Sequence, residues 1–81
     1  MREFILYLIN HLVDEPNKVR LNEVAGQHTI VYEVRVGERD VGKVIGRHGN
    51  TVQSLRTLVS AKAAKQGKRI ILDVVSDGKK I

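Results

Sequence analysis

Two glycines three positions apart, Gly46 and Gly49, separate two helical patterns that have no spacer between them. Before them, a short apolar run over residues 41–45 follows Asp40, which is a plausible N-cap. After them, apolar residues recur at helical spacing over residues 50–66. Glycine permits backbone conformations that other residues avoid, and it has no side chain to keep another backbone at a distance. The chain must therefore turn sharply here, between a helix of little more than one turn and a long helix.

The rest of the chain supplies one more helix and three strands. Apolar residues repeat about every 3.6 positions over residues 2–14, where a helix is expected to end before Pro16. Alternation of apolar and polar residues predicts an edge strand over 18–25 and further strands over 28–36 and 68–76. This order favours an α+β fold in which a three-stranded sheet carries its helices on one face.

The length of 81 residues leaves room for one domain and one core. We expect a single domain over residues 1–81, with a short flexible tail over about 77–81. The chain has no cysteine, which excludes disulfides and thiolate metal sites. The apolar stretch over residues 4–13 is interrupted by polar residues and lacks the flanks of a targeting segment, so we expect a cytoplasmic protein that does not enter a membrane.

The formal net charge of +5 is divided unevenly along the chain. Residues 1–42 carry five basic and seven acidic side chains, whereas residues 43–81 carry nine basic and two acidic ones. The second half, which contains both glycines, is therefore the half expected to face a polyanion. The alternative, that the basic residues only form a solvated surface, stays open.

A glycine loop at the start of a helix is suited to holding phosphate groups. The first N–H groups of a helix beginning near Asn50 have no partner inside that helix and carry a partial positive charge. Arg47 would add a full charge, and a sugar-phosphate strand could lie against the loop from Gly46 to Gly49. The alternative is that the two glycines only cap one helix and open the next, as any tight turn between helices requires.

Residues 44–49, Val-Ile-Gly-Arg-His-Gly, resemble the VIGxxG signature of KH domains, and Val52 stands at the apolar position that usually follows. The order of elements, with a helix and a strand ahead of the KH core, is similar to the type II KH arrangement. Residues 12–16, 33–49 and 63–69 also resemble the small bacterial KhpA (YlqC-type) RNA-binding proteins. That similarity spans nearly the whole chain.

The resemblance implies a non-catalytic protein that binds single-stranded RNA, with about four unpaired nucleotides in one groove, and acts as a post-transcriptional regulator or RNA chaperone. Its glycine loop would hold the RNA backbone, three apolar residues would form a floor for the bases, and three polar residues would flank them. The implied RNA-binding residues are Gly46, Arg47, His48, Gly49, Val44, Ile45, Val52, Lys43, Asn50 and Arg56. Some of the apolar three must instead face the sheet. His48 departs from the family pattern, in which this position is often lysine, glycine or glutamine.

An interaction module is the second function that the sequence supports. One KH groove reads few nucleotides, so a single domain binds weakly and gains from a second linked groove. The resemblance implies partners of two kinds, a second copy of the chain or a larger KH protein of the KhpB (Jag) type. In that reading the domain docks on its partner and contact with RNA is secondary.

Catalysis has little support in the sequence. The three histidines lie in three different predicted elements, and neither a metal-binding spacing nor a pair of carboxylates is evident. Gly42-Lys43 is followed by Val44, where the phosphate-binding loop of an ATPase needs serine or threonine. We therefore expect no enzymatic activity, no cofactor, no metal and no small-molecule substrate.

Overall fold

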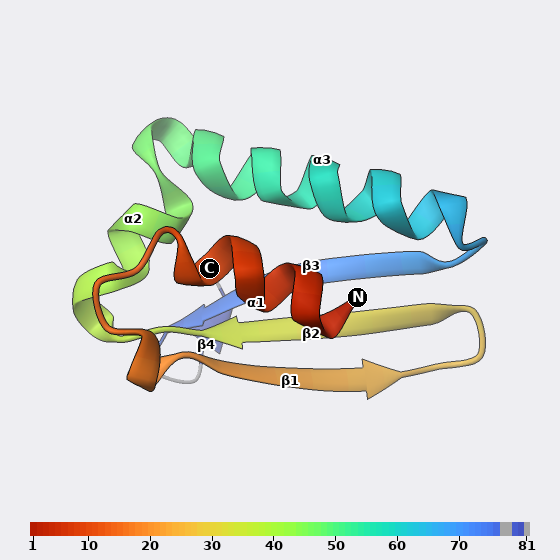
Figure 1. Ribbon diagram of the computed structural model, residues 1–81, viewed down its shortest axis with the longest axis horizontal. Coiled ribbons are helices and arrows are strands. Elements are labelled where there is room, and N and C mark those ends of the chain that lie inside the picture. The colour runs from red at the N-terminus through yellow and green to blue at the C-terminus, as the bar shows by residue number, and fades with distance from the viewer. Residues whose placement is uncertain (77–78, 81) are drawn as a thin grey trace.

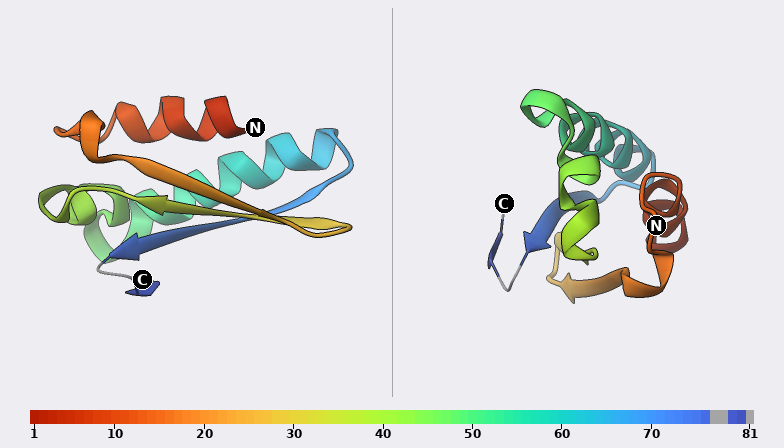
Figure 2. Two further views of the ribbon diagram at one scale, coloured as in Figure 1. Left: turned by 90° about the horizontal axis from the view of Figure 1, so that it is seen from below. Right: turned by 90° about the vertical axis from the view of Figure 1, so that its left-hand side faces the viewer.

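The computed structural model describes residues 1–76 and 79–80. Its helices are α1 (Arg2–Asn10), α2 (Val41–Ile45) and α3 (Asn50–Lys65), and its strands are β1 (Arg20–Ala25), β2 (Thr29–Arg35), β3 (Arg69–Ser76) and β4 (Lys79–Lys80). Single 3-10 turns cover Pro16–Lys18, Glu38–Asp40 and Arg47–Gly49. The predicted α+β architecture is confirmed, because a sheet of three main strands carries its helices on one face (Figures 1 and 2).

The order of the strands in the sheet is β1-β2-β3-β4. β1 and β2 form an antiparallel hairpin, whereas β2 and β3 run parallel, so the chain must cross from one end of the sheet to the other between them. α2, the glycine loop and α3 make this crossing. The glycine loop therefore lies near the end of the sheet where β2 and β3 finish (Figure 1).

The core lies between the inner face of the sheet and the helices. In α3, the buried residues fall at positions 52, 55, 59 and 63, which form one stripe of the helix. They meet inner-face residues such as Val34 and Val74 and two buried isoleucines of α1, Ile5 and Ile9. Each such side chain contributes about 1.5–3 kcal/mol when fully buried. Within the described residues, no helix is long and apolar enough to cross a membrane.

The two ends of the chain differ from the expectation in detail. The helix predicted over residues 2–14 ends at Asn10, because the amides of Leu12 and Val13 both bond to the Ile9 carbonyl and close the helix there. At the other end, a flexible tail was predicted over about 77–81, and residues 77, 78 and 81 of it lie outside the described residues. Lys79–Lys80 form β4, which pairs with the last two residues of β3.

Asp40 is not the N-cap that the sequence suggested, since its side chain makes no capping bond to α2. Its carboxylate is 1% exposed and accepts the backbone N–H groups of Asp14 (3.1 Å) and Glu15 (3.0 Å), with Lys43 Nζ 3.7 Å away. The hydrogen bond from Asp14, helped by Glu15 and Lys43, outweighs burial and holds the pKa of Asp40 below its usual range. Through these hydrogen bonds, Asp40 holds the segment between α1 and β1 against the start of α2.

Replacing Asp40 by asparagine should lower the melting temperature at about pH 7 by several degrees, because the amide NH₂ would face a backbone N–H. Since the pKa of Asp40 is lower in the folded than in the unfolded chain, its contribution is complete above the unfolded value of about 4 and is lost as the pH falls through the folded value. Thermal melts of the parent and Asp40→Asn should therefore converge in acid.

Asp14→Asn is the matched control for this experiment. It removes the exposed carboxylate that pairs with Lys43 but keeps the backbone N–H that Asp40 accepts. Its melting temperature should change little, because exposed ion pairs contribute little to stability. Equal melting of Asp40→Asn and the parent at neutral pH would contradict this role of Asp40.

Candidate nucleic-acid interface

The glycine loop joins α2 to α3 through one tight turn. Gly46 (φ +77°) follows the last residue of α2, and His48 (φ +57°) and Gly49 (φ +76°) both adopt the left-handed conformation. Two backbone hydrogen bonds close the turn, from the amide of Gly46 to the Gly42 carbonyl (2.8 Å) and from the amide of Gly49 to the Gly46 carbonyl (3.1 Å). The predicted sharp turn without a spacer is therefore present.

The two glycines are needed for different reasons. A Cβ on Gly46 would collide with the side chain of Thr51 and lie 2.8 Å from the Thr51 backbone nitrogen, so the first turn of α3 packs directly on Gly46. A Cβ on Gly49 would meet nothing within 4 Å. Gly46 is thus required by the fold, whereas Gly49 leaves open a surface that a ligand backbone can approach closely.

The side chains around the open face of the loop are polar or basic and accessible. Arg47, His48 and Asn50 are all exposed. No side chain caps the first turn of α3, so its N-terminus presents a partial positive charge to an anion, although the Asn50 N–H itself bonds to the Arg47 carbonyl. Among the described residues, His48 is the one non-glycine residue with a positive φ. Histidine tolerates this conformation better than most residues do, at a cost of about 1 kcal/mol.

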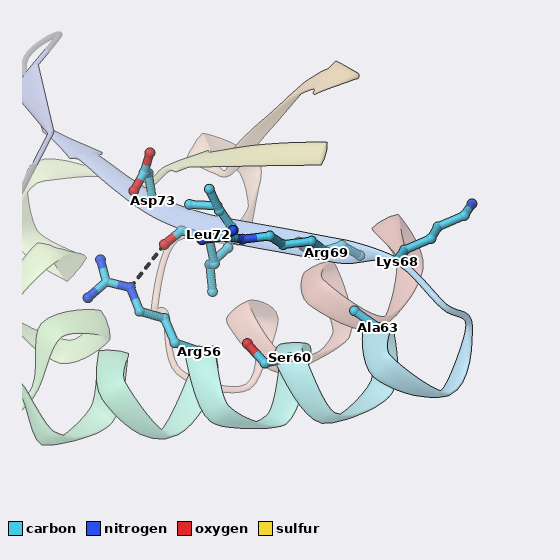
Figure 3. A pocket seen from close by; sticks show the side chains of 9 residues that line it. Arg56, Ser60, Ala63, Lys68, Arg69, Leu72 and Asp73 are labelled. Atoms are coloured by element: carbon cyan, nitrogen blue, oxygen red, sulfur yellow. Dashed lines mark hydrogen bonds between the residues drawn. The ribbon is translucent and has the colours of Figure 1, made fainter. Parts of the chain in front are cut away.

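A groove of about 560 Å³ runs between α3 and β3 (Figure 3). Arg56 and Ser60 lie on its helix side, and its other wall is β3, whose outer edge is covered by β4 at only two residues. The complete lining is Arg56, Ser60, Ala63, Lys68, Arg69, Ile70, Ile71, Leu72 and Asp73. At the end of the groove nearer the start of α3, Arg56 Nε donates a hydrogen bond to the Leu72 carbonyl at 3.0 Å (Figure 3).

The three apolar residues expected to form a floor for bases have different positions. Val44 has no exposed surface and Val52 is 6% exposed, and both pack within the core. Ile45 is half-buried and packs against the edge of that core. Val44 and Val52 therefore have almost no surface that a base could contact. They can instead support the loop from its core side. Ile45 keeps surface on the outside.

Lys43 was expected to flank the RNA, but its ammonium group is engaged by carboxylates. It forms an ion pair with Asp14, 29 residues earlier in the chain, and a longer one with Asp40. The hydrogen bond to Asp14 raises the pKa of Lys43, and Asp40 adds to this effect. Its attraction for a polyanion is reduced while these two pairs persist.

The β3 side of the groove was not predicted from the sequence. Lys68 and Arg69 were counted in the charge of the second half but were not assigned to a site. The helix side of the groove could have been found from the sequence, because Arg56, Ser60 and Ala63 are spaced by four and three residues and so share one face of α3. Among residues 1–76 and 79–80, no cluster of histidine and acidic side chains could hold a metal ion.

The two glycines give a matched pair of variants. Gly46→Ala should lower the free energy of unfolding by about 2–4 kcal/mol, since a collision with the Thr51 backbone adds to the strain of a positive φ. Gly49→Ala should cost only about 1 kcal/mol, because strain is the whole effect. Urea denaturation measures both values. Equal losses, or a larger loss for Gly49→Ala, would show that the contact with Thr51 does not shape the loop.

Comparison with known proteins places the chain in a family. Residues 2–74 match the family described as KhpA/KhpB, KH domain. The chain is 43% identical over 77 residues to the RNA-binding protein KhpA of Chlamydia pneumoniae, covering 95% of this chain and 99% of the relative. It is 41% identical over 75 residues to the RNA-binding protein KhpA of Caldanaerobacter subterraneus, covering 93% and 100%. The chain therefore belongs to the KhpA family of small proteins built from a single type II KH domain.

Proposed function

We propose that this protein binds single-stranded RNA, with the RNA backbone on the loop from Gly46 to Gly49 and the bases turned toward the groove between α3 and β3. The observation that carries the proposal is the open face at Gly49, which leads along α3 into a groove containing Arg56, Lys68 and Arg69. The relatives at 43% and 41% identity are RNA-binding proteins by name.

The loop would supply the attraction for phosphate. Arg47 brings a full positive charge, and the N-terminus of α3 brings a partial one. The absent side chain at Gly49 lets the sugar-phosphate backbone come close. Backbone contacts of this kind position a strand without reading its sequence.

The groove would supply the contacts with bases. Arg56 lies six residues after Asn50, about 9 Å along the axis of α3, so a strand held at the loop can reach it. Lys68 and Arg69 extend the positive charge toward the far end of α3. Base stacking on aromatic residues would have a minor part, because Tyr32 is buried, Phe4 lies under Lys62, and the exposed Tyr7 of α1 does not line the groove. Resemblance to the family supports a cytoplasmic role as a post-transcriptional regulator or RNA chaperone.

The double variant Arg47→Asp/His48→Asp should abolish binding of single-stranded RNA while leaving the fold intact. Both side chains are exposed, and aspartate tolerates the left-handed conformation of residue 48. Fluorescence anisotropy with a labelled RNA measures binding, and circular dichroism checks the fold. RNA binding equal to that of the parent would refute the role of the loop.

Arg20→Asp/Gln27→Asp is the control for the change in charge. Both pairs of substitutions lower the formal charge by the same amount, but Arg20 and Gln27 are exposed on β1 and its hairpin turn, outside the loop and the groove. The control should weaken RNA binding only slightly. A loss as large as that of the loop variant would mean that net charge alone attracts the RNA.

The structure also favours a second role, docking on another protein. Leu58 of α3 is 49% exposed, and Tyr7 of α1 is 62% exposed. The two helices touch where Lys62 lies over the ring of Phe4, at 4.7 Å from its centroid, so the exposed pair belongs to one helical layer. Such a layer suits a second copy of the chain or a larger KH protein of the KhpB type, and pairing would give two RNA grooves.

Leu58→Asp tests this role by size measurement in solution. The parent should associate with increasing concentration, and Leu58→Asp should remain a monomer, because a charge at an apolar contact costs desolvation energy. Thr57→Asp, at the neighbouring exposed position, should behave like the parent. A parent that stays monomeric, both alone and with a KhpB-type protein, would eliminate the docking role.

A further inference from the structure

Arg56 is the one basic side chain that reaches across the groove to β3. It rises from α3, is half-buried, and donates from Nε to the Leu72 carbonyl at 3.0 Å (Figure 3). By contrast, Lys68 and Arg69 lie where β3 begins and line the end of the groove. Arg56 therefore borders the place where a base inserted between helix and strand would lie.

The Leu72 carbonyl belongs to the edge of β3 that faces away from β2. Backbone groups of alternate residues point to the same side of a strand, so Ile70 and Val74 face this edge as Leu72 does. β4 pairs only with Val75 and Ser76, which lie beyond this stretch. The backbone N–H and C=O groups of this edge could bond to a base, but Arg56 already engages one of the two lone pairs of the Leu72 carbonyl.

The chemistry of the guanidinium group determines what it can bind next. It has five N–H donors and no acceptor, and the bond to Leu72 uses only one of them. The remaining donors sit on the two Nη atoms, which lie on the side away from Leu72 in Figure 3. A planar pair of donors is matched by two neighbouring acceptors on a base.

We propose that Arg56 selects the base that lies beside Leu72, accepting guanine or cytosine and rejecting adenine. Guanine presents O6 and N7 side by side, and cytosine presents O2 and N3. Adenine instead places its N6 amino group next to N1 and N7, so its amino donor would meet the Arg56 donors, and Arg56 already engages one of the two lone pairs of the Leu72 carbonyl. This inference rests on the proposed RNA-binding function and adds to it a preference for bases.

The test compares short oligo(C) and oligo(A) RNAs of about eight nucleotides, twice the length that one KH groove holds. The parent should bind oligo(C) about 5- to 100-fold more tightly than oligo(A), the range that one good bidentate contact provides. Arg56→Gln should bring this ratio to one or below, because a glutamine amide pairs with the N6 and N7 atoms of adenine. Anisotropy titrations at one salt concentration give the four affinities.

Two further variants separate base selection from charge. Arg56→Lys keeps the charge but loses the planar fork, so it should lower the oligo(C) to oligo(A) ratio with little loss of overall binding. Lys65→Gln removes one charge from the last turn of α3, outside the groove lining, and should leave the ratio unchanged. If Arg56→Gln does not fold, Arg56→Lys gives the same comparison.

Each outcome distinguishes the two proposals. Base selection is overturned if the parent binds oligo(A) as tightly as oligo(C). It is also overturned if Arg56→Gln lowers the affinities for oligo(A) and oligo(C) by the same factor, as loss of a phosphate contact would. RNA binding itself stands in both of those cases. If the folded parent binds neither RNA, the proposed function fails and the base preference fails with it.

Discussion

The close approach of Gly46 to Thr51 is the contact on which the rest of the site depends. It allows only four residues to separate α2 from α3, with the first turn of α3 packed on the loop. Because β2 and β3 are parallel, the two helices must span the whole sheet between them, and a tight junction places the loop at one end. The open face at Gly49 and the groove along α3 then follow from the direction in which α3 leaves the junction.

The local features of this fold could be predicted from sequence because they depend on neighbouring residues. Apolar spacing gave the order of helices and strands, and the glycine pair located the turn. The role of Asp40 could not be predicted in this way, since the amides that it accepts belong to Asp14 and Glu15, about a third of the chain away. The bonds from Asp14 and Glu15 to Asp40 then hold the chain that follows α1 in a non-helical path.

The arrangement of the candidate site was predicted only in part, because a sequence motif does not show contacts between residues far apart in the chain. Arg47, His48 and Asn50 are exposed around the loop, as the motif requires. The motif could not show that Val44 is enclosed in the core or that Lys43 is paired with Asp14. Nor could it show the β3 wall of the groove, because only the folded sheet brings Leu72 opposite Arg56. Part of the positive charge of the second half, from Arg47 at the loop and Arg56, Lys68 and Arg69 in the groove, is thereby brought to the candidate site.

The most direct measurement of this account is an amide NMR titration of the full chain with a short single-stranded RNA. If the RNA backbone lies on the glycine loop and the bases lie in the groove, the largest shift changes should fall on Gly46 to Asn50 and on Ile70 to Leu72. Residues on the outer face of the sheet, such as Val24, should change little. Changes confined to α1 or to that outer face, with the loop unaffected, would contradict the account.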